Sequence, residues 1–91
     1  MKRYHVFVEG RVQGVGFRSF CMLNAQRLNL TGNVRNLTNG IVEMFVQGEE
    51  ADIDRFLAIV EKGNTWIRVD EVSVKPVPVV EGEKKFGYSH Y

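Results

Sequence analysis

The stretch Gly10-Arg11-Val12-Gln13-Gly14-Val15-Gly16-Phe17-Arg18 decides the fold, because it separates an alternating apolar segment from one with helical spacing. Glycine adopts positive φ at little steric cost, so this stretch can turn sharply and point successive backbone N–H groups to one side. The start of the helix that follows adds further unpaired N–H donors. A strand, a glycine-rich loop and a helix in this order predict an anion site, with phosphate as its natural occupant.

Other phosphate and nucleophile motifs fit this loop poorly. A Walker loop needs Gly, four residues and then Gly-Lys-Ser/Thr, but Val15 stands where its second glycine belongs. A dinucleotide fingerprint would use Gly14 and Gly16, yet Ser19 replaces its third glycine. No cysteine precedes Arg18 as a nucleophile. The Arg18 guanidinium presents a planar fork of donors that matches two phosphoryl oxygens, so we expect it to close the loop.

The spacing of hydrophobic residues predicts the elements on either side of the loop. Tyr4, Val6 and Val8 alternate with His5, Phe7 and Glu9, a pattern that predicts a half-buried strand leading into the loop. From about Phe17 to Asn29, apolar residues recur every three or four positions and predict a helix with one buried face. Strands follow at 32–37 and 41–47, and Asn39-Gly40 predicts a two-residue hairpin turn with positive φ at both positions.

The second half repeats a helix and a strand. Ile53, Phe56, Leu57 and Val60 have the i, i+3, i+4, i+7 spacing of a helix, which Lys62-Gly63 closes. A valine-rich strand follows at 69–80, and its two prolines restrict the later half to a sheet edge or a bend. After a turn at 81–85, residues 86–91 predict a short last strand. The order β-α-β-β-α-β with an extension is ferredoxin-like.

Composition sets bounds on the class of protein. The 91 residues, 44% of them hydrophobic, suffice for one small core, so we expect one domain over 1–91. Twelve basic and eleven acidic residues leave a charge of +1, which provides no broad basic field for nucleic acid. No apolar run is long enough for a membrane span, and there is no signal-peptide core. With one cysteine, the sequence predicts a cytoplasmic protein without a disulfide, and we expect a monomer.

Two blocks together resemble the signatures of the acylphosphatase family. Gly10 to Arg18 resembles the first signature, and Thr31 to Asn36 followed by Gly40 to Glu43 resembles the second, in the same order. The similarity extends over essentially the whole chain. It implies a ferredoxin-like βαββαβ sandwich, an α+β fold with a mainly antiparallel sheet and two helices on one face. It also implies hydrolysis of acyl phosphates, small molecules that yield a carboxylate and inorganic phosphate.

The resemblance assigns roles to individual residues. Arg18 holds the phosphoryl group with the backbone of a phosphate-binding loop that consists of Arg11, Val12, Gln13, Gly14, Val15, Gly16 and Phe17. Asn36 positions the attacking water, since its neutral amide accepts a hydrogen bond from the water without bringing negative charge beside phosphate. The resemblance, not the spacing, puts Asn36 opposite Arg18. It implies no metal and no cofactor, and the chain has no cluster of metal ligands at a recognised spacing.

Two other functions stay open at this point. A non-catalytic domain that binds small anions or regulates another process would keep the loop but hydrolyse nothing. An RNA-recognition module shares the element order but displays aromatic side chains on its central strands, where residues 41–47 supply Phe45 alone. We expect Ser19 to make local hydrogen bonds, since no base lies beside it in the motif. The terminal Tyr88, His90 and Tyr91 could equally close the sheet or touch substrate.

Overall fold

The alternating segment before the glycine loop forms strand β1 (Lys2–Arg11) in the computed structural model, which describes residues 1–89. Side chains alternate between the two faces of a strand, so Val6 and Val8 point into the core while His5 and Phe7 lie on the opposite face. β1 pairs with a strand on each side, antiparallel in both cases. It is therefore an internal strand, and the loop that follows it begins between two paired neighbours rather than at an edge of the sheet.

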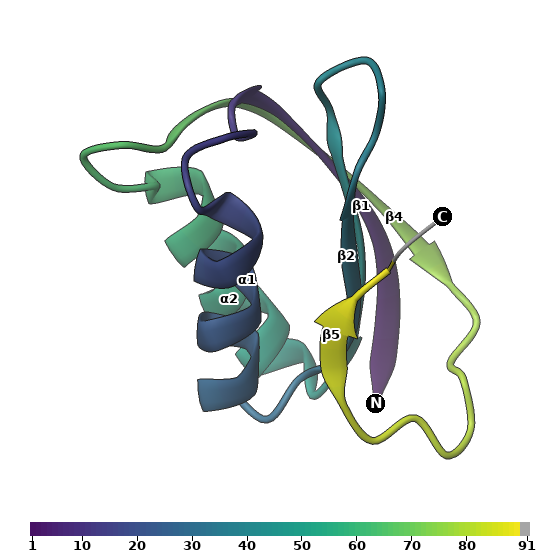
Figure 1. Ribbon diagram of the computed structural model, residues 1–91. Helices are drawn as coiled ribbons and strands as arrows, with labels where there is room; N and C mark the ends of the chain where they lie inside the picture. Colours follow the sequence, from purple (N-terminus) through teal and green to yellow (C-terminus); the bar gives the residue numbers. More distant parts are fainter. Residues whose placement is uncertain (90–91) are drawn as a thin grey trace.

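The remaining elements confirm the expected ferredoxin-like α+β fold. They are α1 (Phe17–Arg27), β2 (Thr31–Asn36), β3 (Val42–Gly48), α2 (Glu50–Lys62), β4 (Arg68–Val77) and β5 (Phe86–Tyr88). The strand order is β4-β1-β3-β2-β5, and only the short β5 runs parallel to its neighbour, β2. Both helices lie on one face of the sheet (Figure 1). The opposite face has no helix in the described part of the chain.

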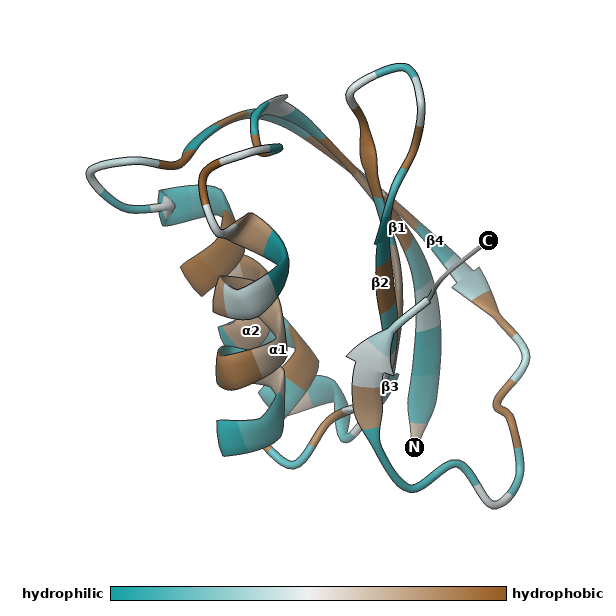
Figure 2. Cartoon of the chain, in the orientation of Figure 1, coloured by the Kyte–Doolittle hydropathy of each residue, from teal (hydrophilic) through white to brown (hydrophobic). Residues whose placement is uncertain are grey.

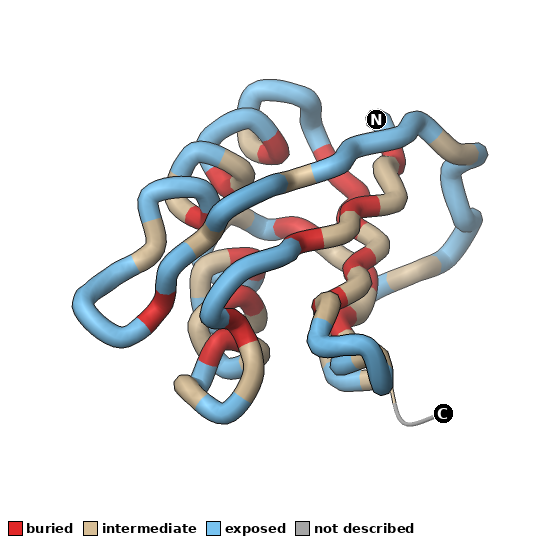
Figure 3. The backbone as a smooth tube through the Cα atoms, turned by 90° about the horizontal axis from the view of Figure 1, so that it is seen from above, coloured by how far each residue is buried: buried red, intermediate tan, exposed pale blue. Residues whose placement is uncertain are grey.

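The core fills the space between the helices and the sheet, where buried residues gather (Figure 3). Hydrophobic positions occur along both helices and the strands (Figure 2). Each helix supplies one buried stripe, as its spacing predicts. The fully buried side chains include Phe17 and Cys21 from α1, Ile53 and Phe56 from α2, and Val6, Val8, Val34, Val42, Met44 and Val46 from the strands. Because Phe17 is the first residue of α1, burying its ring pins the helix start onto the sheet.

Most predicted boundaries differ from the observed ones by one or two residues. Helix α1 ends at Arg27 rather than Asn29, because Asn29 adopts a left-handed φ of 58°, which Asn tolerates better than most residues. Strand β5 ends at Tyr88. The predicted last strand also included His90 and Tyr91, which lie outside the described residues.

The predicted two-residue hairpin turn is wrong. The N–H of Leu37 donates to Ile41 O and the N–H of Gly40 donates to Leu37 O, so the loop has three residues, 38–40. Within this loop only Gly40 has positive φ, at 90°, whereas the predicted turn needs positive φ at Asn39 as well. A turn followed by a left-handed glycine is the next most common hairpin connection, and Asn-Gly suits it equally well.

Strand β4 lies at an edge of the sheet, as its prolines predict. Pro76 still has a register partner, Tyr4, but Pro78 lies beyond the strand end. Lacking an N–H, proline interrupts an edge strand at the smallest cost. Neither helix in residues 1–89 combines the length and the apolar character that are needed to cross a bilayer.

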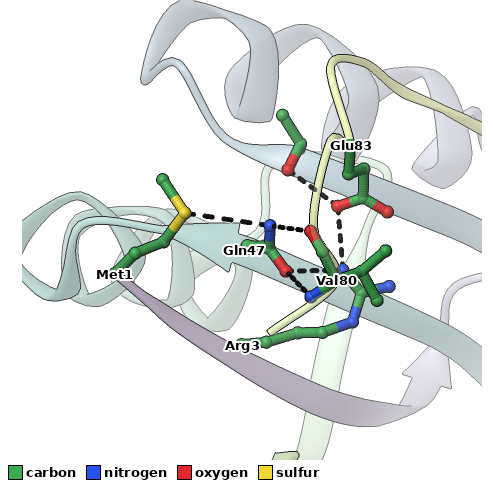
Figure 4. Close-up of polar contacts among 6 residues, drawn as sticks. Met1, Arg3, Gln47, Val80 and Glu83 are labelled. Atoms are coloured by element: carbon green, nitrogen blue, oxygen red, sulfur yellow. Dashed lines mark hydrogen bonds and ion pairs between the residues drawn. The ribbon is translucent and has the colours of Figure 1, made fainter. Parts of the chain in front are cut away.

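The connection from β4 to β5 is fixed to the sheet by a polar network (Figure 4). Gln47 is 3% exposed; its amide donates to Val80 O at 2.9 Å and its side-chain oxygen accepts from the Val80 N–H at 2.8 Å. Arg3, 7% exposed, donates to Gln47 at 3.0 Å and to Glu83 at 2.8 Å. Buried polar groups need such partners, so this network holds the approach to β5 in place.

Candidate active site

The glycine loop is held at both ends by buried side chains. Val12 and Phe17 are each 1% exposed, whereas Gly14 and Gly16 between them are exposed. Gly14 has φ of 72° and Gly16 has φ of 75°, a left-handed conformation that costs other residues strain. Two anchored ends with two left-handed residues between them produce a fixed, sharply turned loop.

The backbone donors of this loop are available to a ligand. Among residues 1–89, no backbone carbonyl accepts a hydrogen bond from the N–H groups of residues 12–16. Helix α1 begins at Gly16 as its N-cap, without a side-chain cap and without an acidic residue in its first turn. Unpaired N–H groups and the positive end of a helix dipole favour an anion at this place.

A pocket opens at this end of the molecule. It is lined by Val12, Gly14, Gly16, Phe17, Arg18, Ser19, Asn36 and Tyr88. Of these lining residues, only Arg18 carries a charge. The pocket therefore combines one guanidinium with backbone donors and with the amide of Asn36, a combination suited to a phosphate oxyanion.

Strand alternation explains why Asn36 reaches this pocket. Asn36 is two residues from Val34, which is fully buried beneath the helices, so both side chains lie on the helix side of β2. Arg35 lies on the other face, where it donates to Glu43. Because β2 ends at Asn36, its amide lies beyond the covered part of the sheet and stays exposed beside the start of α1.

Gln13 links the loop to the hairpin that carries Asn36. Its side-chain amide donates to Leu37 O at 2.9 Å and to Ile41 O at 3.2 Å. The loop and the β2–β3 turn lie at the same end of the molecule (Figure 1). These two bonds therefore fix the distance between the glycine loop and β2.

Tyr88 contacts both Arg18 and Ser19 in the pocket wall. The Arg18 guanidinium carbon lies 5.1 Å from the centre of the Tyr88 ring, within the range of a cation–π contact. The Tyr88 hydroxyl is hydrogen-bonded to Ser19 Oγ at 2.8 Å. The motifs did not single out Tyr88, because it comes from β5, far from the loop in sequence. The only signal in the sequence was an aromatic residue in the last predicted strand.

The structure brings together some of the predicted site residues and separates others. Arg18 and Asn36 line one pocket with Val12, Gly14, Gly16 and Phe17. Gln13 turns its side chain toward the hairpin, and Val15 packs against the core. Arg11 ends β1 opposite Arg68, and its side chain lines a separate hollow with Lys62 and Trp66. Those three loop residues can act on a ligand in this pocket only through their backbone.

The remaining reactive groups lie elsewhere. Cys21 is fully buried, and burial raises the pKa of its thiol, so the thiolate form is suppressed. In residues 1–89, no three His, Cys, Asp or Glu side chains are grouped closely enough to hold a metal ion.

The uncovered sheet face bears on the RNA alternative. His5, Phe7 and Phe45 lie there, and the His5 ring stacks on Phe45 with centroids 4.2 Å apart. The arginines beside them are paired with carboxylates, Arg3 with Glu83 and Arg35 with Glu43. Since nucleic-acid binding depends on cations that are free to meet phosphates, this face does not favour an RNA partner.

The α+β sandwich, together with the loop and its arginine, defines a ferredoxin-like protein with a pocket whose lining suits an anion. A model of the acylphosphatase family matches residues 4–88. The chain is 47% identical over 90 residues to an acylphosphatase from Clostridium beijerinckii, which covers 99% of this chain and 100% of that protein. It is 48% identical over 86 residues to an acylphosphatase from Geobacillus kaustophilus, with 94% and 92% covered. The crystal structure of acylphosphatase from Bacillus subtilis has a TM-score of 0.93 at 36% identity, covering 99% of this chain and 100% of that one. The chain belongs to the acylphosphatase family.

Proposed function

We propose that this protein is an acylphosphatase that hydrolyses the carboxyl–phosphate bond of small acyl phosphates and releases a carboxylate and inorganic phosphate. Membership of the family supports this reaction. The observation that carries the proposal is the pocket in which Arg18, the glycine loop and Asn36 meet. No other described pocket combines a guanidinium with the unpaired donors of a glycine loop.

In this proposal, Arg18 and the loop amides hold the phosphoryl group. The guanidinium fork binds two phosphoryl oxygens, and the N–H groups of residues 12–17 bind the oxygens that it does not reach. Charge spreads over these oxygens in the transition state of phosphoryl transfer, and donors that are already in place stabilise it without rearranging. Arg11, Gln13 and Val15 contribute their backbone, since their side chains lie away from the pocket.

Asn36 orients the attacking water in this proposal. Its side-chain oxygen accepts a hydrogen bond from the water, whose oxygen forms a bond to phosphorus as the bond from phosphorus to the carboxylate oxygen breaks. The leaving group departs as a carboxylate, and the water's protons pass to phosphate and solvent. Because a carboxylate is a good leaving group, positioning and charge stabilisation suffice, and we expect activity without a metal ion.

Two substitutions separate the proposed roles. We expect Arg18→Gln to lose both affinity for inorganic phosphate and turnover of benzoyl phosphate. We expect Asn36→Ala to keep phosphate affinity within about twofold and to lose turnover about 10²–10³-fold, the usual effect of removing one preorganised polar group. Phosphate inhibition constants and hydrolysis rates measure the two quantities. Asn33→Ala, three residues earlier in β2 and half-buried on the opposite face of the strand, is the matched control.

The non-catalytic alternative predicts a different pattern. A domain that only binds anions would bind phosphate, depend on Arg18, remain indifferent to Asn36 and show no turnover. That result would replace the proposed reaction with an anion-binding function.

A further inference from the structure

We infer that Tyr88 is a positioning residue, which holds the Arg18 guanidinium in the orientation that receives phosphate. This inference rests on the proposed phosphate site and adds to it a residue from the far end of the chain. Tyr88 lines the pocket with Arg18 and Ser19 and is 37% exposed.

Arg18 needs such support, because no carboxylate within residues 1–89 holds it. Among residues 1–89, Arg3 and Arg35 are paired with glutamates, whereas Arg18 forms no salt bridge. Its guanidinium carbon lies 5.1 Å from the Tyr88 ring centre. An aromatic ring restrains the guanidinium without pairing its N–H groups with an anion. A carboxylate partner would occupy those same N–H groups.

The Tyr88 ring is placed by its strand and held through its hydroxyl. Phe86, 3% exposed, is two residues earlier in β5, so both side chains share the helix side of this strand. The Tyr88 hydroxyl and Ser19 Oγ are 2.8 Å apart, which ties β5 to the first turn of α1. Ser19 directly follows Arg18, so the same contact sets the ring relative to the arginine's own backbone.

The experiment compares phosphate affinity in Tyr88→Phe and Tyr88→Leu. Tyr88→Phe keeps the ring and loses the bond to Ser19, so we expect phosphate affinity within about twofold of wild type. Tyr88→Leu removes the ring, and we expect about two- to fivefold weaker phosphate binding, the range for an exposed cation–π contact. Inhibition by inorganic phosphate, or calorimetry with phosphate alone, measures both. In an Arg18→Gln background, Tyr88→Leu is expected to cause no further loss.

Phe45→Leu is the matched control, because Arg3 lies over the Phe45 ring at a similar 5.2 Å on the uncovered face of the sheet. It removes an equivalent contact away from the pocket, and phosphate affinity is expected to stay unchanged. Unchanged affinity in folded Tyr88→Leu, or equal losses in the Leu and Phe variants, would overturn the inference. So would a wild type that binds no phosphate. Phosphate binding that responds to Tyr88, without benzoyl phosphate hydrolysis, would instead retain the inference and reject the proposed reaction.

Discussion

At the scale of single residues, the site depends on how a guanidinium differs from other cations. Arg18 is the only charged residue among those that line the pocket, so in the proposed function its donors carry the electrostatic part of phosphate recognition. A guanidinium offers two parallel donors to two oxygens, whereas an ammonium is a point charge with no preferred plane. Replacing Arg18 by a cation of another shape should therefore weaken phosphate binding, even though the charge is kept.

Arg18→Lys tests this distinction. The substitution keeps the positive charge but loses the fork and the contact of a planar group with the Tyr88 ring. We expect phosphate affinity to fall and kcat/KM for benzoyl phosphate to drop about 10²–10³-fold. Phosphate binding and turnover equal to wild type in Arg18→Lys would mean that charge alone is sufficient.

Single residues also mark where the sequence is informative. Arg18 and Asn36 could be singled out because they stand in two local motifs, and the period-two rule gives the face of Asn36 once β2 is known. Tyr88 could not be assigned in this way. Its place depends on β5 pairing in parallel with β2, a contact between segments far apart in sequence that no local pattern specifies.

At the scale of elements, the glycine loop and the β2–β3 hairpin act as a unit because Gln13 joins them. The sequence predicts both elements but not this link, since a glutamine in a loop has many possible partners. It likewise predicts the hairpin but not its three-residue loop, because Asn-Gly is compatible with either turn. Local chemistry thus narrows the choice of connection, and the pairing of the flanking strands decides it.

Gln13→Ala tests the link. Losing two hydrogen bonds to carbonyl oxygens is expected to lower the free energy of unfolding by about 1–3 kcal/mol. We also expect kcat to fall more than phosphate affinity, since the loop stays anchored while its distance from Asn36 is no longer fixed. Urea unfolding and steady-state kinetics measure the two effects.

The control for that substitution is Gln26→Ala, which removes a bond from a glutamine amide to Phe86 O at 3.3 Å. We expect Gln26→Ala to affect stability but not kcat. Wild-type kcat in Gln13→Ala would show that the link is not needed for turnover.

At the scale of the whole molecule, one face of the sheet is covered by helices and the other depends on polar and aromatic contacts. Near its centre, Glu43 accepts from His5 at 2.8 Å and from Arg35. Burial by itself would raise the pKa of Glu43, but the hydrogen bonds from His5 and Arg35 outweigh it and lower the pKa. The sequence predicts the layers from periodicity, whereas this network becomes visible only once the strand register is known.

The lowered pKa of Glu43 predicts how stability depends on pH. A carboxyl whose pKa is lower in the folded state adds stability above its ordinary pKa of 4.5, and this is lost as the pH falls through the folded value. We expect Glu43→Gln to be less stable than wild type at pH 7, with a smaller difference near pH 3. Urea unfolding at both values measures it, with the exposed Glu81→Gln as control. A difference that is independent of pH would contradict this account.

The most direct test of the proposed reaction is hydrolysis of benzoyl phosphate by the wild-type protein in excess chelator, followed by ultraviolet absorbance. The account predicts turnover that is unchanged by the chelator and inhibited by inorganic phosphate. A folded protein that binds phosphate but produces no benzoate, or one whose activity disappears with chelator, would contradict the proposed hydrolysis by Arg18, the loop amides and Asn36.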